Sequence, residues 1–479
     1  MMRLRTFTER QEGFAMQWVV VLTAVLVLLS LTTVDLVRSE AASSANSRQK
    51  GAVFQAAEAG MDDFLAKLTD DKTYYFRNVH PAESTRRPVS GADVDSQPGG
   101  TCNVDSAGKK RDASNGLIPA ATWTGSISWT YPNGKDNWCT ITLNGRSYQY
   151  NLQITPPSAA NLNVRVGATG RPHGSTNVAE WRALEEWVQF SMVSDFQMIT
   201  TDDYTVGATA TTNGKIYSSH DIQHSGTATA DVFAENLVNP SCCGSFNLVA
   251  PAQKYDKTNI RSVIKNPIDF NTFTGSLDDI QRASQAAGTY LDATPNTWKI
   301  VFSSAGTYTK QACTNVGAAD PAQTAPTCGA VQGPYTVPAN GAIFSEKTVL
   351  VSGTVNGRVT IASNYDIDIV GPLDYQTIGD DVLGLIAKND IIVAKYAPYD
   401  LTWRAAVIAQ NGARHSWDSS GDHGTANHYG STASNQHPFM DMFDFRNYYY
   451  DPSLQYLPPP WFPVLDEAYS VNLFREVAP

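Results

Sequence analysis

The sequence predicts a mainly β protein in which a right-handed parallel β-helix, a solenoid of short strands, is carried on a long N-terminal α-helix that crosses a membrane. Two observations lead to this fold class. An uncharged, apolar segment from Phe14 to Val34 follows a short basic leader. In the second half of the chain, short apolar runs recur between Asn, Asp and Gly turns, a pattern that is typical of stacked solenoid coils.

The N-terminal region divides into a basic leader, residues 1–13, and a predicted transmembrane helix, residues 14–36. At a rise of about 1.5 Å per residue, the uncharged segment is long enough to cross a bilayer core. Basic residues before the segment favour a cytoplasmic N-terminus and an exported remainder. The alternative is a cleavable signal peptide, whose apolar core would be shorter.

Residues 37–70 are predicted to continue this helix as an amphipathic stem. Few helix breakers interrupt the segment, and its apolar residues recur at the spacing of three and four that marks one helical face. These residues are Phe54, Ala57, Met61, Phe64, Leu65 and Leu68.

Two motifs at the N-terminus resemble those of pilus proteins. Glu12-Gly13-Phe14 resembles the end of a class III prepilin leader, and the segment Ala52–Gly60 resembles the FQAAEAG signature of PilX-type pilus-assembly proteins. The resemblance implies that a prepilin peptidase cuts after Gly13 and that the new N-terminal Phe14 is methylated. A plain signal anchor without a pilus connection is the alternative.

One residue departs from the pilin pattern. Most pilins carry Glu five residues into the mature helix, where this chain has Trp18. That Glu normally pairs with the mature N-terminus of a neighbouring subunit. Its absence fits a tip or minor component, or a pilin-like protein that stays in the membrane.

Residues 71–165 are predicted to form a loop-rich segment with β-hairpins that pack on the stem. Alternating runs at Trp138–Leu143 and Ser147–Ile154 flank Asn144-Gly145, which is a strong hairpin signal. The following segment, Val178–Val188, has apolar residues at helical spacing and is predicted to be a short helix.

Residues 166–412 are predicted to form the β-helix, with an insertion at about 233–338. Stacked coils would bury a column of Val, Ile and Leu that no coil can bury alone. A β-sandwich, with antiparallel hairpins, is the alternative. Residues 413–479 are predicted to be an aromatic and Pro-rich loop and a C-terminal cap over the open end of the β-helix. The related segments that suggest the repeat begin at Ser218, Ser345, Ser363 and Ala387.

The late repeat and the tail extend the resemblance. Asp380–Ile391, Tyr450-Asp451-Pro452 and the Pro-rich segment Pro458–Pro463 are similar to segments of PilX-type proteins that carry a β-helical domain of unknown function. The resemblance implies a structural role and brings no catalytic residue and no cofactor. It implies as partners other pilin-like subunits, inner-membrane pilus assembly proteins and a prepilin peptidase.

The six cysteines all lie in the part predicted to be exported, where disulfides form. Six cysteines permit about 15 pairings, so the sequence does not determine the connectivity. Local closure would pair Cys102 with Cys139 and Cys313 with Cys328, leaving Cys242 and Cys243 as a vicinal disulfide or two half-bridges. A metal site is not predicted, because the sequence has no C-x-x-C pair.

Other site chemistries find little support. The net charge of −11 and the lack of a dense Lys/Arg patch give no reason to expect a nucleic-acid partner. Two sets of residues are candidates for a carboxylate or metal site, but we interpret the first as outward-facing turn residues and the second as a surface loop. They are Asp366, Asp368, Asp380, Asp381 and Asp390, and His415, His423, His428 and His437. His220 and His224 are predicted to face solvent.

The sequence therefore predicts a non-catalytic assembly component of a type IV pilus-like system. It would be a single-pass membrane protein of the bacterial cell envelope, with the bulk of the chain outside the cytoplasm, in a pilus or at the cell surface. The alternative is a surface-anchored adhesin or a glycan-binding or glycan-cleaving β-helix protein unrelated to pili. Aromatic residues after Phe439 would supply its binding surface.

Overall fold

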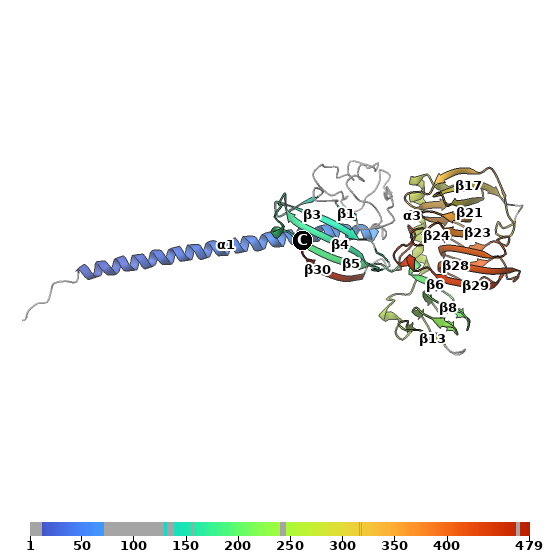
Figure 1. Cartoon of the computed structure of the whole chain (residues 1–479), viewed down its shortest axis with the longest axis horizontal. Coiled ribbons are helices and arrows are strands. Elements are labelled where there is room, and N and C mark those ends of the chain that lie inside the picture. Colours follow the sequence, from blue (N-terminus) through green and yellow to red (C-terminus); the bar gives the residue numbers. More distant parts are fainter. Residues whose placement is uncertain are drawn as a thin grey trace, which may run out of the picture.

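The computed structural model describes residues 12–70, 129–131, 138–155, 157–158, 160–239, 246–315, 317, 319–465 and 470–479. A long helix, α1 (Glu12–Asp70), projects from the rest of the molecule, and an antiparallel sheet packs on its second half (Figure 1). Beyond the sheet lies a β-solenoid of about 11 turns. The mainly β fold and its long N-terminal helix confirm the predicted fold class.

Helix α1 is continuous, but its two halves have different surroundings. From Val19 to Val34, and at Val37, its apolar side chains are exposed, whereas Val53, Phe64 and Leu68 are fully buried. The predicted apolar face of the stem is confirmed by this burial. We find no helix among the described residues with an apolar stretch sufficient to span a membrane.

The stem sheet is antiparallel, in the order β1-β3-β4-β5-β30, with β2 paired to β3. The predicted hairpin is confirmed: Asn144 and Gly145 have positive φ angles of 50° and 76° and join β2 to β3, the geometry of a type I′ turn. The strands are β1 (Trp129–Tyr131), β2 (Cys139–Leu143), β3 (Arg146–Thr155), β4 (Val164–Pro172), β5 (Arg182–Gln189) and β30 (Ser470–Val477).

The prediction of a helix at Val178–Val188 is wrong. Only Val178–Glu180 forms a single 3₁₀ turn, and the rest is strand β5. Strand β5 pairs with β4 on one edge and with β30, from the C-terminus, on the other. Because pairing on both edges satisfies its backbone, the aromatic and branched side chains of β5 adopt a strand despite their helical spacing.

The solenoid stacks its coils in an order that differs from the chain order. From β6 the chain builds coils away from the stem entry point, with β9, β12 and β14 stacked in parallel. The strands of this half are β6 (Phe196–Thr200), β7 (Tyr204–Val206), β8 (Thr211–Thr212), β9 (Lys215–Ser218), β10 (Ile222–His224), β11 (Thr227–Ala228), β12 (Val232–Ala234), β13 (Asn247–Leu248) and β14 (Lys254–Tyr255).

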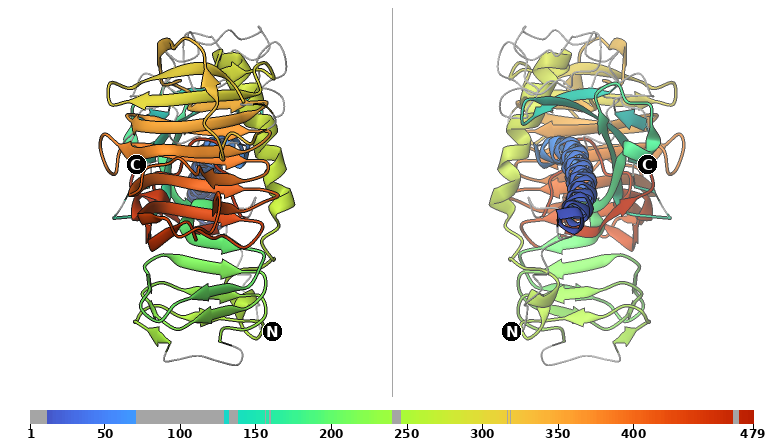
Figure 2. Two further views of the ribbon diagram at one scale, coloured as in Figure 1. Left: turned by 90° about the vertical axis from the view of Figure 1, so that its right-hand side faces the viewer. Right: turned by 90° about the vertical axis from the view of Figure 1, so that its left-hand side faces the viewer.

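The chain then crosses to the far end through helix α3 (Thr274–Ala287), which lies along the side of the stack (Figure 2). From there it stacks coils back until β28 pairs in parallel with β6. The coil strands of this half are β15 (Tyr290–Leu291), β16 (Thr297–Ser303), β20 (Ala342–Ser345), β21 (Thr348–Val355), β22 (Arg358–Ser363), β23 (Ile367–Tyr375), β24 (Val382–Ala387), β25 (Ile391–Val393), β26 (Leu401–Ala409), β27 (Arg414–Ser416), β28 (His423–Ser434) and β29 (Phe443–Tyr450).

The repeat read from the sequence corresponds to the register of these coils. Ser345 pairs with Ser363, and Ser363 with Ala387. Inside the stack, Val349, Ile367 and Ile391 form a fully buried column. The serines have a structural role, since the Ser345 and Ser363 hydroxyls each accept a backbone N–H two residues on and so close the turns.

The segment expected to be an insertion, at about 233–338, contains coil strands. Strands β12, β14, β15 and β16 pair in parallel with neighbouring coils. The excursion is antiparallel and shorter, made by β17 (Thr307–Thr314), β18 (Thr327–Cys328) and β19 (Gln332–Thr336). Strands of two or three residues such as β12 and β14 carry too weak a pattern to be recognised in the sequence.

The C-terminal region also differs from the expected loop and cap. Residues 413–450 contribute β27, β28 and β29, and the Pro-rich tail then packs along the side of the solenoid. Arg358 Nη2 donates a hydrogen bond of 2.8 Å to the carbonyl of Pro458, and Trp461 Nε1 donates one of 2.7 Å to that of Asn340. Four further 3₁₀ helices are Val193–Asp195, Ile260–Ser262, Phe270–Phe273 and Pro452–Gln455.

Candidate functional site

The FQAAEAG segment of α1 is the place where the stem sheet meets the helix most closely. Ala56 and Ala57 are fully buried there. A Cβ on Gly60 would lie 2.3 Å from Cδ2 of Tyr150, and a Cβ on Gly170 of β4 would lie 2.2 Å from the carbonyl oxygen of Val53. Small residues on both surfaces therefore allow helix and sheet to approach within backbone contact.

The preceding half of α1 presents apolar side chains to the outside. An exposed apolar surface of this extent marks an interaction with lipid or with another protein. Its large exposed residues are Val19, Val20, Val21, Leu22, Val25, Leu26, Val27, Leu28, Leu29, Leu31, Val34 and Val37.

A charged clamp holds the last strand of the chain in the stem sheet. Glu185 of β5 is bonded by Arg165 of β4 on one carboxylate oxygen and by Arg475 of β30 on the other, each through an Nη2–oxygen distance of 2.6 Å. Burial alone would raise the pKa of Glu185, but the nearby indole of Trp187 and the hydrogen bonds from the two arginines outweigh it and lower the pKa to about 2.

The two halves of the solenoid meet at a junction where the stacking is incomplete. Strand β28 pairs with β6, so one face of the stack continues across the junction. On the other faces, β7 pairs with β10, and β8 with β11, while β29 pairs with β28. The edges of β7 and β8 therefore face the last coil of the other half without a continuous ladder.

Side-chain amides bridge part of this gap. Asn213 accepts the backbone N–H of Tyr450 at 2.9 Å and donates to its carbonyl at 3.2 Å. Gln197 donates to the carbonyl of Tyr448 at 2.9 Å and accepts the N–H of Gly214 at the same distance. These two amides take the place of ladder hydrogen bonds next to β29.

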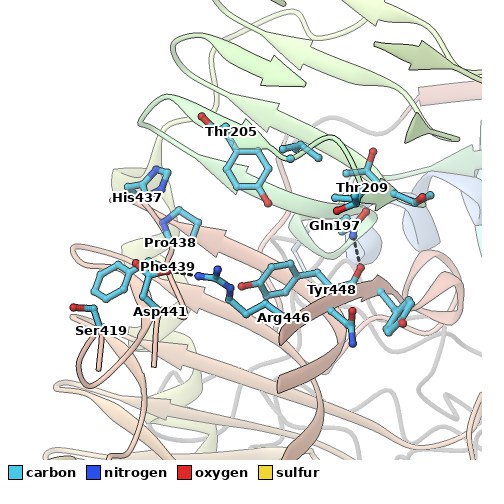
Figure 3. A pocket seen from close by; sticks show the side chains of 18 residues that line it. Gln197, Thr205, Thr209, Ser419, His437, Pro438, Phe439, Asp441, Arg446 and Tyr448 are labelled. Atoms are coloured by element: carbon cyan, nitrogen blue, oxygen red, sulfur yellow. Dashed lines mark hydrogen bonds and ion pairs between the residues drawn. The ribbon is translucent and has the colours of Figure 1, made fainter. Parts of the chain in front are cut away.

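A cavity of about 880 Å³ occupies the rest of the junction (Figure 3). Its volume lies within the range of small-ligand sites, roughly 300–1,000 Å³. Aromatic rings, hydroxyl groups and one ion pair, between Arg446 and Asp441, line it. The lining residues are Gln197, Tyr204, Thr205, Val206, Gly207, Thr209, Ala210, Thr211, Thr212, Ser419, His437, Pro438, Phe439, Asp441, Arg446, Asn447, Tyr448 and Tyr449.

A polar layer lies inside the solenoid beside this cavity, between two separate apolar clusters. Arg414 is 1% exposed, and its Nε and Nη1 have no hydrogen-bond partner in the part of the chain that the structure describes. Its guanidinium carbon lies 4.8 Å from the ring centroid of Tyr448. Burial raises the pKa of Tyr204 to about 12, with Tyr448 adding to the rise and Arg414 opposing it, so these three residues are electrostatic neighbours.

Buried His428 belongs to the same layer. Its ring stacks on that of Trp403 at a centroid distance of 3.6 Å, and its Nε2 lies 3.0 Å from the carbonyl of Ala405. Burial, and then the charge of Arg414, lower the pKa of His428 to about 3. The imidazole is therefore neutral at physiological pH and donates this hydrogen bond to the carbonyl.

The structure places the other predicted histidines differently from the sequence interpretation. His423 and His428 lie in β28 and His415 in β27, so they do not belong to a surface loop. His224, expected to face solvent, is fully buried beside Thr212, whose Oγ1 lies 3.1 Å from its Nε2. Its spacing of two from Ile222 puts both inside the same coil.

Asp366, Asp380 and Asp390 lie at turns without being buried, but the prediction of outward-facing residues is wrong for Asp368 and for Asp381, which is 5% exposed and accepts the N–H groups of Gly357 and Thr377. Asp366 and Asp390 accept backbone N–H groups of the next coil, from Asp390 and Ala413 respectively. Asp368 is fully buried, and neither carboxylate oxygen has a hydrogen-bond partner among the described residues. Burial and the charges of Asp366, Asp320 and Asp390 raise its pKa well above the usual value. Within the described ranges, no group of three or more His, Cys, Asp or Glu side chains is placed to hold a metal ion.

The disulfide predicted between Cys313 and Cys328 is present, between paired strands β17 and β18. Cys139 is also disulfide-bonded. Cys102, Cys242 and Cys243 lie outside the described residues. Gly13 and Phe14 lie in the first turn of α1, and residues 1–11 of the leader lie outside the described part.

Comparisons with known proteins identify no family for this chain and one weak structural likeness. No family model matches the chain, and no curated protein matches it. Among solved structures the chain is similar to the competence-associated pilin ComZ from Thermus thermophilus. The TM-score is 0.30 and the identity 13%, over 90% of this chain and 98% of that chain. At this TM-score the likeness does not establish a shared fold.

Proposed function

We propose that this protein is a structural, non-catalytic assembly component of a type IV pilus-like system. The observation that carries the proposal is that the two halves of one continuous helix have different surroundings. The first half of α1 exposes apolar side chains, and the second half packs on an antiparallel sheet through the FQAAEAG segment. A pilin stem needs both halves, one to enter the membrane or a bundle of stems and one to fix the head.

The exposed half of α1 indicates which partners the protein would bind. Its leucines and valines would pack against lipid or against other apolar stems. The proposed partners are therefore other pilin-like subunits and inner-membrane pilus assembly proteins, with a prepilin peptidase acting at Gly13. Trp18, in the position where most pilins have Glu, favours a minor or tip position over the fibre shaft.

The solenoid would be presented outside the cytoplasm as a rigid head. The chain passes between the stem sheet and the solenoid twice, once between β5 and β6 and once between the Pro-rich tail and β30. The two passages contact each other, since Met192 bridges to Val464 and the N–H of Val193 donates to the carbonyl of Pro463 at 3.1 Å. Strand β30 then enters the stem sheet beside β5. A head tethered at two places transmits its orientation to the stem better than a head on one flexible linker.

The proposal is tested by tagging the protein in its own cells and recovering its stem partners after membrane solubilisation. Two variants are compared, one with Leu22→Asn and Leu29→Asn in the exposed half of α1, the other with Ser44→Asn and Ser47→Asn further along the same helix. We expect pilin-like subunits to co-purify with the wild type and the serine variant and to be lost with the leucine variant. Recovery of the same partners with all three proteins would contradict the proposal.

A surface-anchored adhesin remains the second candidate, and the junction cavity is the observation that favours it. An adhesin on a signal anchor has no need of processing at Gly13, so the state of that bond separates the two functions.

A further inference from the structure

We propose that the junction cavity is a binding site for a carboxylate-bearing sugar, either the acidic end of a glycan or a short acidic oligosaccharide. This inference concerns the solenoid alone and goes beyond the pilus role proposed above. It rests on the charge balance of the cavity, on the side chains that line it and on the state of the strand edges around it.

The cavity lining carries one cation, Arg446, and one anion, Asp441, and a second cation, Arg414, is buried against the ring of Tyr448. Arg446 forms an ion pair with Asp441 through Nη1. Arg414 has no carboxylate within ion-pair distance among the described residues, although it is 1% exposed. A buried guanidinium without a carboxylate at ion-pair distance is unfavourable, and an anionic ligand beside Tyr448 would supply a counter-charge.

The geometry of Arg446 suits a carboxylate. Asp441 bonds one terminal nitrogen and so fixes the orientation of the guanidinium, which lies between Phe439 and Tyr448 in the cavity (Figure 3). Nε and Nη2 have no bond to a described residue. The planar guanidinium presents such a pair of donors to both oxygens of one carboxylate. Arg414, behind the ring of Tyr448, adds charge without touching the ligand.

The remaining lining fits a sugar ring. Tyr204, Tyr448 and Phe439 supply aromatic faces, which pack against the C–H face of a pyranose. Thr205, Thr209 and Ser419 supply hydroxyls on the cavity rim, and a hydroxyl both donates and accepts, as a sugar hydroxyl does. The Tyr204 and Tyr448 hydroxyls have no hydrogen-bond partner in the described structure.

A peptide added as a strand fits this cavity less well. Strand addition needs a row of free backbone groups along an edge. Beside β29, the carbonyl of Tyr448 is bonded by Gln197, and both backbone groups of Tyr450 are bonded by Asn213. The cavity therefore offers side chains more than backbone to its ligand.

The test is a calorimetric titration of the full chain in detergent with three probes. They are digalacturonate, its dimethyl ester, and a glutamate-rich hexapeptide. The ester keeps the rings and ring hydroxyls and replaces each carboxylate by a neutral methyl ester, which removes both charges. We expect digalacturonate to bind at least about tenfold more tightly than its ester, since one charge-assisted hydrogen-bond pair corresponds to tenfold or more in affinity.

Two variants locate the site, and one is a matched control. Arg446→Gln should weaken digalacturonate binding about tenfold, and Tyr448→Phe should weaken it several-fold. Arg404→Gln is the control, because Arg404 also pairs with an aspartate, Asp374, and lies over a tyrosine, Tyr429, away from the cavity lining. It should bind like the wild type.

Three results would overturn the inference. They are no binding of digalacturonate at millimolar concentration, equal binding of the acid and the ester, or a loss of binding in Arg404→Gln equal to that in Arg446→Gln. Tighter binding of the peptide than of the sugar would also overturn it and would identify the cavity as a peptide site. Circular dichroism of each variant shows that the head is folded, so each titration is decisive.

Discussion

Gly170 of the stem sheet lies in direct contact with the backbone of α1 at Val53, so close that a Cβ on Gly170 would be 2.2 Å from the Val53 carbonyl oxygen. The same virtual atom would be 2.9 Å from the backbone nitrogen of Ala57. Because helix backbone cannot yield as a flexible side chain can, this contact fixes the helix on the sheet. It also explains in physical terms why the helix carries small residues here.

Gly170→Ala is therefore expected to destabilise the stem by about 1–3 kcal/mol, the usual cost of overpacking. Thermal unfolding of the full chain measures the effect, with proteolysis of α1 as a second readout. Gly167→Ala is the matched control in the same strand, since its Cβ would meet its nearest neighbour at an ordinary 3.4 Å. An equal loss of stability in both variants would show that the close approach to Val53 is not the cause.

The disulfide between Cys313 and Cys328 is expected to stabilise the excursion that covers part of the solenoid. Between its cysteines lie Pro321 and Ala322, whose carbonyls accept hydrogen bonds from Tyr396 Oη at 2.9 Å and Lys395 N at 2.8 Å. A loop of 15 residues corresponds to about 3 kcal/mol of stabilisation in the chain-entropy model.

Replacing both cysteines by alanine should accelerate hydrogen exchange at the Lys395 amide. The Val407 amide, in the central strand β26, is the internal control and should exchange at the wild-type rate. Unchanged exchange at Lys395 would mean that the segment is held by its other contacts.

His224 should make the solenoid less stable in acid. Burial lowers its pKa from 6.5 to about 4, so the folded state binds fewer protons than the unfolded state between these values. The free energy of unfolding then falls as pH falls from 6.5 to 4, by at most about 1.4 kcal/mol per pH unit from this group. Thermal unfolding of His224→Gln should depend less on pH across that window. His220→Gln, an exposed neighbour, should keep the wild-type dependence, and a parallel change in both variants would contradict the account.

Asp368 is expected to reduce stability at neutral pH. Its raised pKa means that its contribution to stability is present in acid and lost as pH rises through that raised value. Asp368→Leu, between the buried Leu350 and Ile392 of neighbouring coils, should raise stability at pH 8 by about 2 kcal/mol and by less at pH 4. Asp366→Asn is the contrast, because it keeps an acceptor oxygen for the 3.1 Å turn bond from the Asp390 N–H and removes one of the charges that raise the pKa of Asp368, so it should raise stability at pH 8 by less than Asp368→Leu does. Urea unfolding at both pH values checks these signs, and a less stable Asp368→Leu at pH 8 would refute the first.

Local signals in the sequence were sufficient to predict several elements of the fold. Asn144-Gly145 forces positive φ angles and thereby defines its hairpin, and the repeat spacing corresponds to the coil register because identical turns stack. Strand β5 departs from the predicted helix because its apolar spacing fits a helix as well, and only its pairing with β4 and with the distant β30 makes it a strand.

The junction cavity could not be predicted in the same way. It exists because β28 returns to pair with β6, strands that are more than 200 residues apart in the chain. Nothing local to either strand encodes that pairing. Arg414 and His428 belong to a segment rich in Gly, Ser and Asn, so their burial was hidden by the polarity of their neighbours.

The most direct test of the proposed pilus role is the mass of the mature N-terminus, measured on protein purified from its own membranes. The account predicts a chain that begins at Phe14 with a methylated amine, and an unprocessed chain when the prepilin peptidase is deleted. An intact Met1, or a cut beyond Val34, would contradict the pilus assignment and leave the surface-anchored adhesin as the better description.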